Sequence, residues 1–287
     1  MNGILKNSVR LVLFTMFSTN LSCIAQNTED QNQTESTASP NVQILENIIQ
    51  VPYSNSCRTL RIYLPPSYDS SDKNYPVIYM LDGQNLFDVR TSYSGEWEVD
   101  ETMDALAKEQ ELEAIVVGVD NHGVFRMQEY NVYDHIEFGK QQGREFTNYL
   151  VDQIKPLIDK IYRTKPEREH NIIMGSSMGG LMAYYILMTN PDVFSMAGVY
   201  SPSFWVSEEI YSLHQQNPRL NESKIHMIVG SEEGGMVPVF TRMRDSLSPL
   251  MNDRRLKTEI VQGGTHSEAF WKEQFKETAL WFLSNTF

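Results

Sequence analysis

The chain of 287 residues has only two cysteines, Cys23 and Cys57, and far fewer basic than acidic side chains. Its 24 lysines and arginines against 37 aspartates and glutamates give a net charge of −13. Such a surface repels phosphate backbones and anionic lipids, so we do not expect nucleic acid as a partner. The sequence also lacks a metal-ligand spacing, a phosphate-binding loop and a dinucleotide-binding fingerprint. These absences favour chemistry without a metal or other cofactor.

The N-terminus has the pattern of a secretory signal peptide. Basic side chains precede an apolar run over residues 11–17, and small residues follow it. This run is too short to span a bilayer, so we expect a signal peptide over residues 1–25 and export to the periplasm or the cell exterior. The alternative is a lipoprotein signal, in which Cys23 would be lipidated and would tether the protein to a membrane. Because either route removes or modifies Cys23, no intramolecular disulfide is expected.

The remaining chain divides into a short polar segment and one large domain. Residues 26–41 contain no large apolar side chain and are expected to form a disordered tether. The domain is expected to occupy residues 42–287. At its start, the apolar-rich ranges 42–51 and 58–64 favour an antiparallel pair of strands at the edge of a sheet.

Strands and helices alternate through the rest of the domain. Apolar runs predict strands at 76–81, 114–119, 172–174, 196–200, 225–229 and 257–261, and helices are predicted at 99–110, 142–161, 237–251 and 267–283. Uninterrupted apolar strands separated by helices are typical of an α/β fold with a mostly parallel central sheet covered on both faces. In such sheets ligands bind beyond the carboxyl ends of the strands.

One serine stands where a strand should turn into a helix. The stretch 175–179 reads Gly-Ser-Ser-Met-Gly and fits the pattern Gly-x-Ser-x-Gly with Ser177 at its centre. A serine on such a sharp turn holds its hydroxyl clear of the sheet, and the two glycines let strand and helix approach closely. The context therefore predicts that Ser177 is a nucleophile.

A serine nucleophile needs a base and a carboxylate that orients the base. His266 follows the last predicted strand, where its imidazole could reach the serine turn and exchange the hydroxyl proton. The strand at 225–229 is followed by two carboxylates, Glu232 and Glu233. We prefer Glu233 as the orienting acid, with Glu232 as the alternative.

Backbone N–H groups near Ser177 could hold a developing oxyanion. Met178 opens the helix after the serine and has a free N–H, and Gln84 follows the strand at 76–81 in a turn that could aim a second N–H inward. Asn85, Asn121 and Trp205 follow predicted strands and are expected to contact the substrate.

Seven blocks of sequence resemble esterases of the α/β-hydrolase superfamily, in the group that contains enterochelin-type siderophore esterases and carbohydrate acyl esterases. The blocks are 80–88, 117–121, Arg126 with 129–130, 174–180, 201–205, 229–233 and 264–266. The resemblance runs from about residue 42 to the C-terminus and implies the α/β-hydrolase fold. It also implies Ser177 as nucleophile, His266 as base and a carboxylate near Glu233 as third member.

The sequence therefore predicts an exported, cofactor-free serine esterase that hydrolyses a carboxylic ester through an acyl-enzyme. The expected substrate is a siderophore lactone or an acylated carbohydrate. Two alternatives are acyl transfer to a sugar and a hydrolase fold that only binds a glycan or siderophore. The sequence does not determine the acyl and alcohol parts of the substrate or the oligomeric state.

Overall fold

The computed structural model describes residues 35–134, 137 and 139–284. The expected signal peptide and Cys23 lie outside these residues. Cys57 is disulfide-bonded, which contradicts the expectation of no disulfide.

Eight strands form one sheet in the order β1-β2-β4-β3-β5-β6-β7-β8. Their bounds are β1 Val42–Gln50, β2 Cys57–Tyr63, β3 Val77–Leu81, β4 Ile115–Val119, β5 Asn171–Ser176, β6 Met196–Tyr200, β7 Lys224–Gly230 and β8 Leu256–Val261. Strands β1 and β2 pair with each other antiparallel, β2 pairs antiparallel with β4, and every other pair is parallel. The predicted α/β class with an antiparallel N-terminal edge is confirmed.

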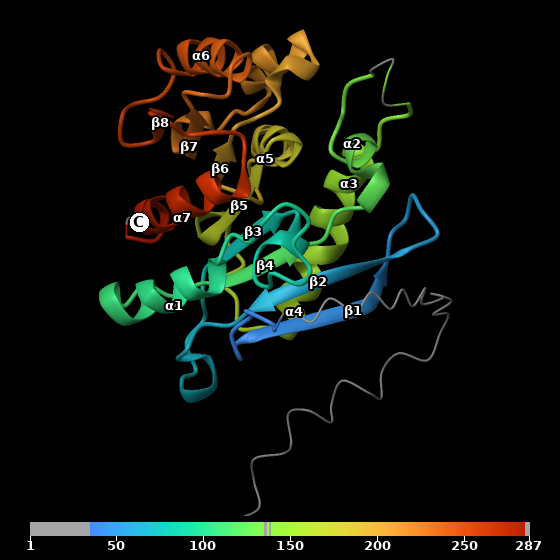
Figure 1. The fold of residues 1–287 in the computed structure, drawn as a ribbon, viewed down its shortest axis with the longest axis vertical. Coiled ribbons are helices and arrows are strands. Elements are labelled where there is room, and N and C mark those ends of the chain that lie inside the picture. The colour runs from blue at the N-terminus through green and yellow to red at the C-terminus, as the bar shows by residue number, and fades with distance from the viewer. Residues whose placement is uncertain (1–34, 135–136, 138, 285–287) are drawn as a thin grey trace, which may run out of the picture. The chain divides into compact units, whose positions relative to one another are not determined.

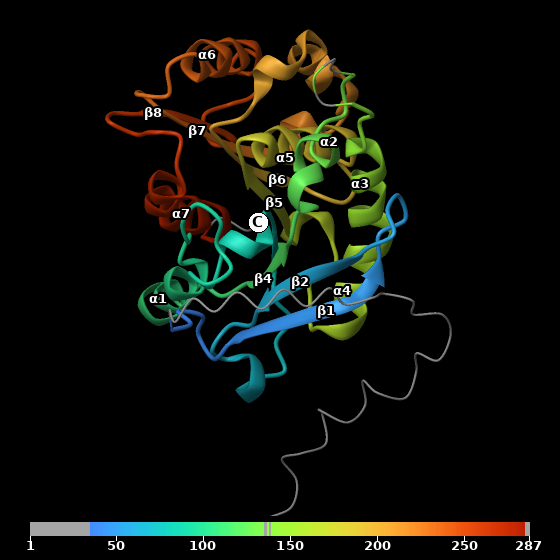
Figure 2. The same ribbon diagram turned by 45° about the vertical axis from the view of Figure 1, so that its right-hand side comes forward.

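Helices cover both faces of the sheet (Figure 1). Their bounds are α1 Val99–Gln110, α2 Arg126–Glu129, α3 Gly143–Tyr149, α4 Lys155–Ile161, α5 Met178–Thr189, α6 Met236–Leu247 and α7 Glu268–Leu283. Helices α1 and α7 lie side by side on one face, and α3, α4 and α5 lie on the other (Figure 2). No helix of the described residues is long and apolar enough to cross a membrane.

The two faces of the sheet have separate apolar cores. In β3, Val77, Tyr79 and Leu81 pack against the side of α3, α4 and α5, whereas Ile78 and Met80 pack against the side of α1 and α7. All five side chains are at most 3% exposed. Alternate residues of a strand point to opposite faces, so a strand buried on both sides must be apolar throughout. Burial of the strands on both faces therefore explains the uninterrupted apolar runs in the sequence.

The helix predicted at 142–161 is divided in the structure. Helices α3 and α4 are joined by a π-helical turn, Leu150–Ile154. Pro156 lies at the first turn of α4, and a proline has no N–H to continue the hydrogen bonding of the preceding helix. Phe146, Leu150 and Ile154 are all fully buried. The apolar face of the predicted helix therefore continues through the π-helical turn.

The segment before β1 contacts the domain. Ser36 Oγ donates to Asp88 Oδ2 over 2.7 Å, and the backbone N–H of Ser39 donates to Asp100 Oδ2 over 2.7 Å. The segment thus already contacts the domain from Ser36 onward, although the tether was expected to run to residue 41.

Candidate active site

The candidate site residues follow the carboxyl ends of parallel strands. Gln84 follows β3, Asn121 follows β4, Ser177 follows β5, Glu233 follows β7 and His266 follows β8. Because parallel strands end at the same edge of a sheet, residues separated by up to 182 positions meet there.

Ser177 occupies a strained turn between β5 and α5. Its backbone has φ 56° and ψ −121°, outside the usual regions for a residue with a side chain. Its N–H donates to the carbonyl of Tyr200 over 2.9 Å, which ties the turn to the end of β6. A Cβ on Gly175 would lie 2.5 Å from the carbonyl oxygen of Gly179. Gly175 is therefore required for the strand and the helix to approach this closely, whereas a Cβ on Gly179 would lie 3.1 Å from Asp82 Oδ2.

Glu233 holds the imidazole of His266. His266 Nδ1 lies 2.7 Å from Glu233 Oε2, and the Glu233 side chain is fully buried while that of His266 is 39% exposed. The other carboxylate oxygen of Glu233 accepts hydrogen bonds from the N–H of Gly230 over 2.7 Å and from Ser201 Oγ over 2.6 Å. A carboxylate that accepts this contact favours the imidazole tautomer with its proton on Nδ1, which leaves Nε2 unprotonated.

Two glycines bring the loops that carry Glu233 and His266 together. A Cβ on Gly230 would lie 2.2 Å from the carbonyl group of Gly264. The N–H of Glu232 donates to the Gly264 carbonyl over 2.9 Å. Glu232 thus uses its backbone to join the loops, and it is Glu233 whose side chain contacts His266.

Ser177 and His266 line the same cavity. Within the described residues, the hydroxyl of Ser177 has its polar contact with Ser203 Oγ, at 3.5 Å. Ser203 in turn donates its N–H to the carbonyl of Ser177 over 3.1 Å. In this state the serine hydroxyl is turned toward the loop after β6, and rotation about its Cα–Cβ bond is the motion that would redirect it.

The cavity has a volume of about 980 Å³. Its lining residues are Asp82, Gln84, Asn85, Thr91, Tyr93, Ser94, Asp120, Asn121, Gly123, Val124, Arg126, Ser176, Ser177, His266, Ser267, Glu268 and Trp271. The expected substrate contacts Asn85 and Asn121 are among them. Trp205 is not: it lies on the surface, 47% exposed.

Of the two expected oxyanion donors, Gln84 lines the cavity and Met178 directly follows Ser177 in the chain. Met178 is the first residue of α5, where an N–H has no partner within the helix. Gln84 lies in a short 3₁₀ turn, Gly83–Asn85, that follows Asp82 in the left-handed conformation (φ 59°). The Gln84 side chain is engaged elsewhere, because its Oε1 accepts from the N–H of Asn121 over 3.2 Å. This contact occupies the amide oxygen and not the amide nitrogen, and the backbone N–H of Gln84 remains the predicted oxyanion donor.

An ion pair forms the floor of the cavity near the serine turn. Arg126 donates from Nε and Nη2 to the two carboxylate oxygens of Asp82, each over 2.7 Å. Asn121 Nδ2 donates to the same carboxylate over 2.7 Å. Although burial works against the charge, the Asp82 carboxylate raises the pKa of Arg126 above its ordinary value. The pair fixes both charges in place beside Ser177.

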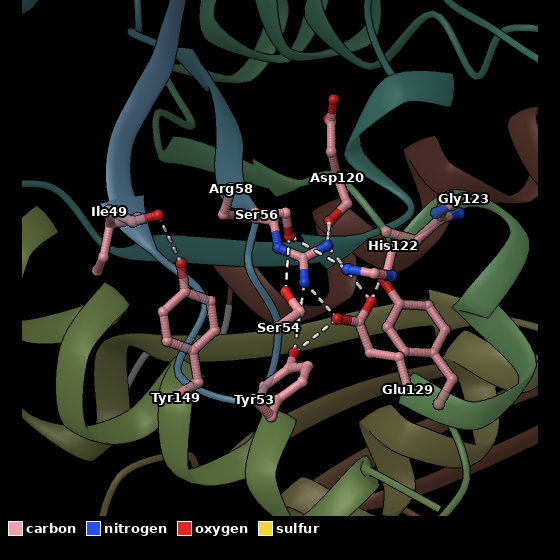
Figure 3. A network of polar contacts seen from close by, with 12 residues as sticks. Ile49, Tyr53, Ser54, Ser56, Arg58, Asp120, His122, Gly123, Glu129 and Tyr149 are labelled. Atoms are coloured by element: carbon pink, nitrogen blue, oxygen red, sulfur yellow. Dashed lines mark hydrogen bonds and ion pairs between the residues drawn. The ribbon is translucent and has the colours of Figure 1, made fainter. Parts of the chain in front are cut away.

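A network of polar contacts joins the β1–β2 hairpin to Glu129 and to the loop after β4 (Figure 3). Arg58 and Glu129 form an ion pair whose side chains are 3% and 0% exposed. Arg58 also donates to the carbonyl of Asp120 over 2.6 Å, and Glu129 accepts from the N–H of His122 over 2.9 Å and from Tyr53 OH over 2.6 Å. The loop after β4, which contributes Asp120 and Asn121 to the lining, is therefore anchored from behind.

A group of carboxylates lies outside this cavity. Oxygens of Glu96, Asp100 and Glu101 lie within 4.8 Å of one another. Burial raises the pKa of each, that of Glu101 to about 8. None of the three lines the cavity, and Thr37 Oγ1 already donates to Glu96 over 2.7 Å. We assign this group no part in the candidate site.

Sequence reasoning did not single out several residues at the site. Ser201 and Ser203 hold Glu233 and Ser177, Trp271 donates to Ser201 over 2.8 Å, and Glu268 lines the cavity. Their places in the chain could have identified them as site residues. Ser201 and Ser203 follow the end of β6, and Glu268 begins the helix after His266.

The comparisons with known proteins bear on the family and the fold of the chain. A family model with the description "Putative esterase" matches residues 52–282. The chain belongs to this esterase family. Among curated relatives, the uncharacterized protein YbbA of Bacillus subtilis is 24% identical over 241 residues, which cover 78% of this chain and 92% of the relative.

Two further relatives have named activities. The ferri-bacillibactin esterase BesA of Bacillus subtilis is 27% identical over 173 residues, covering 52% of this chain and 55% of the relative. The endo-1,4-beta-xylanase/feruloyl esterase of Xylanibacter ruminicola is 27% identical over 175 residues, covering 57% of this chain and 23% of the relative. This chain thus corresponds to only part of these two proteins.

Solved structures show the same fold. The BES protein from Bacillus cereus superposes with a TM-score of 0.70 at 21% identity, covering 90% of this chain and 99% of that one. The enterobactin esterase FES from Shigella flexneri gives a TM-score of 0.70 at 17% identity, covering 88% of this chain and 61% of that one. The fold is that of the α/β-hydrolase esterases, and family and fold together support ester hydrolysis as the activity.

Proposed function

We propose that this esterase uses Ser177 as nucleophile, His266 as general base and Glu233 as the acid that orients the base. The observation that carries the proposal is the 2.7 Å contact between His266 Nδ1 and the buried Glu233 carboxylate, at the edge of the cavity that Ser177 also lines. An imidazole held in this way has its second nitrogen available to take a proton from a serine hydroxyl.

The reaction begins with attack of Ser177 Oγ on the ester carbonyl carbon. His266 Nε2 takes the hydroxyl proton, and the carbonyl oxygen becomes an oxyanion that accepts from the N–H groups of Met178 and Gln84. Collapse of this intermediate breaks the bond to the alcohol oxygen, which leaves with the proton from His266. Water, deprotonated by His266, then attacks the acyl-enzyme and releases the carboxylic acid and free Ser177.

The contact between Ser177 and Ser203 is compatible with this mechanism. At 3.5 Å it is a weak hydrogen bond, so little free energy opposes rotation of the Ser177 hydroxyl toward His266. Catalytic hydrogen bonds are often long or absent before substrate binds. We infer that the productive rotamer forms when an ester occupies the cavity.

The substrate class follows from the relatives only as far as a carboxylic ester. One relative is named for a ferri-siderophore and another for a feruloyl ester. We therefore propose a siderophore lactone or an acylated carbohydrate as the substrate.

The proposal is tested by replacing Ser177 with alanine. Wild type should hydrolyse a short p-nitrophenyl ester and become labelled by a fluorophosphonate, with the label on Ser177 in the peptide map. Ser177→Ala should lose both, by on the order of 10⁴-fold or more in rate. The matched control is Ser212→Ala, which removes an exposed serine outside the cavity and should change neither. Activity of Ser177→Ala within a few-fold of wild type would overturn the mechanism.

A further inference from the structure

The charges that line the cavity are unbalanced. Asp82, Asp120 and Glu268 contribute carboxylates, and Arg126 contributes the one guanidinium among the described lining residues. Both carboxylate oxygens of Asp82 already accept from Arg126. The Asp120 carboxylate forms an ion pair with Arg61, which donates to its two oxygens over 2.8 and 3.0 Å. Glu268 is therefore left as the carboxylate that faces the substrate space without a cation.

Glu268 lies close to the reacting groups. It is the first residue of α7, two positions after His266. Among the described residues it makes no ion pair, and its closest polar partner is Asn85 Nδ2, which donates over 3.4 Å. Burial, with a smaller effect of the negative Asp82, raises the pKa of Glu268 above its usual range. A carboxylate in this position repels an anion and accepts hydrogen bonds from hydroxyl groups.

The rest of the lining is suited to a neutral polar ligand. Ser94 contributes a hydroxyl that can donate to or accept from a sugar hydroxyl, and the Thr91 hydroxyl, which donates to the carbonyl of Gln84 over 2.8 Å, can still accept from one. The amide of Asn121 is already held, because its Nδ2 donates to Asp82 and its Oδ1 accepts from the N–H of Gly123. At the rim, the ring of Tyr93 is 93% exposed, and its backbone N–H is fixed by Asn85 Oδ1 over 3.0 Å. Exposed aromatic faces of this kind can stack on a sugar or a phenolic ring.

We propose that this cavity selects esters of neutral, hydroxyl-rich alcohols, that is acylated carbohydrates, over ferric siderophores, and that Glu268 is a specificity-determining residue. The proposal rests on the ester hydrolysis proposed above and narrows its substrate. An iron-loaded tris-catecholate is a multiply charged anion, because its deprotonated oxygens outweigh the charge of the iron. The lining offers no uncommitted cation in the described part of the chain, and the chain as a whole carries a net charge of −13. Both features disfavour such an anion.

The experiment compares two natural ester types on the wild-type protein, with a p-nitrophenyl ester as reference. The neutral ester is a feruloylated arabinoside, and the anionic one is an iron-loaded catecholate trilactone. We expect kcat/KM for the arabinoside to exceed that for the ferric trilactone by on the order of 100-fold. Added salt should raise the rate on the ferric trilactone and leave the rate on the arabinoside unchanged, because salt screens repulsion between charges.

Charge reversal tests the role of Glu268. Glu268→Lys should shift the ratio of the two kcat/KM values toward the ferric trilactone by about tenfold or more, and Glu268→Gln should shift it less. The control is Glu273→Lys, which makes the same charge change at an exposed position of α7 that does not line the cavity. An equal shift from Glu268→Lys and Glu273→Lys would remove the specific role of Glu268. A ferric trilactone hydrolysed as well as the arabinoside would overturn the selectivity.

Binding to the Ser177→Ala variant separates this inference from the proposed mechanism. Titration calorimetry with each ester measures selection without turnover. Tighter binding of the arabinoside supports the inference even if the wild-type protein hydrolyses nothing, in which case the serine mechanism alone fails. Tighter binding of the ferric trilactone overturns the inference even if hydrolysis depends on Ser177.

Discussion

Trp271 donates its indole N–H to the hydroxyl oxygen of Ser201 over 2.8 Å. The same hydroxyl donates to Glu233, and the indole ring also meets the ring of His266 edge to face, with centroids 5.0 Å apart and planes at 85°. One tryptophan thus supports both partners of the His266–Glu233 contact. Ser201 itself is fully buried with φ 42°, a strained conformation that the surrounding hydrogen bonds must hold.

Replacing Ser201 with alanine removes one of the donors to Glu233. A hydrogen bond to a charged group contributes about 1.5–3 kcal/mol, so we expect kcat to fall by about tenfold. Because Ser201 does not line the cavity, KM should stay unchanged. Steady-state kinetics on a p-nitrophenyl ester measures both constants. Ser195→Ala removes a buried hydroxyl that has no hydrogen-bond partner among the described residues, and it controls for the loss of a buried serine as such. A similar loss of kcat in that variant would argue against a positioning role for Ser201.

The two neighbouring glutamates should differ sharply in their effect on activity. Glu233→Gln keeps the shape of the side chain but cannot hold the same tautomer of His266, and we expect kcat to fall by on the order of 10²- to 10⁴-fold. Glu232→Gln should retain activity within about twofold, because Glu232 joins the loop to Gly264 through its backbone N–H. Initial rates with matched enzyme concentrations decide between them. A larger loss in Glu232→Gln would reassign the acid.

The fold could be predicted from sequence because local patterns determine it. Strands buried on both faces must be apolar throughout, so their positions could be predicted from the apolar runs. The loops that follow these strands contain Ser177, Glu233 and His266. The order of strands was not readable, since β3 lies between β4 and β5 only through long-range pairing. The disulfide at Cys57 was missed because the prediction took Cys23 to be removed or modified and therefore expected no disulfide.

The candidate site was predictable only to the level of which loops form it. Ser201 and Glu233 are 32 positions apart, and their contact depends on the pairing of β6 with β7 and on side-chain conformation. Trp205 is a second example, because its place after a strand did not determine the direction of its side chain. It follows β6 as expected, but the 3₁₀ turn Phe204–Val206 buries Phe204 and turns Trp205 to the surface.

A buried histidine should make stability depend on pH on the acid side. His226 is fully buried, and Nδ1 lies 2.8 Å from Thr278 Oγ1. Burial, together with the positive Lys257, lowers the pKa of His226 from 6.5 to about 3. The unfolded chain therefore binds a proton at His226 below pH 6.5 that the folded chain does not bind until about pH 3. Stability from this group is complete above 6.5 and is lost as the pH falls toward 3.

The variant His226→Asn tests this dependence, because asparagine can still hydrogen-bond to Thr278 but does not titrate. Between pH 6 and 4 the free energy of unfolding of wild type should fall more steeply, by up to about 1.4 kcal/mol per pH unit from this one group. Urea unfolding at several pH values gives the two slopes. Equal slopes would mean that His226 does not remain neutral in the fold.

The network behind the cavity wall should be required for both stability and activity. Glu129→Gln leaves the guanidinium of Arg58 buried without its ionic partner, and breaking such a pair costs about 3–5 kcal/mol. The same change weakens the hold on the N–H of His122, which follows two lining residues, Asp120 and Asn121. We therefore expect a lower free energy of unfolding and also a lower kcat/KM, measured by urea unfolding and by ester hydrolysis on the same preparation.

The milder control for this network is Tyr53→Phe. It removes the hydroxyl that donates to Glu129 and accepts from Arg58 Nη2 over 3.3 Å, and it leaves the ion pair in place. It should destabilise by about 1–2 kcal/mol and affect kcat/KM less than Glu129→Gln does. The exposed pair of Glu208 and Arg242 provides the opposite case: Glu208→Gln should leave unfolding and kinetics within experimental error, because solvent screens such pairs. If Glu129→Gln proved as harmless as Glu208→Gln, the contacts of Arg58 and Arg61 with Asp120 would be enough to hold the loop after β4. The wall of the cavity would then not depend on the Arg58–Glu129 ion pair.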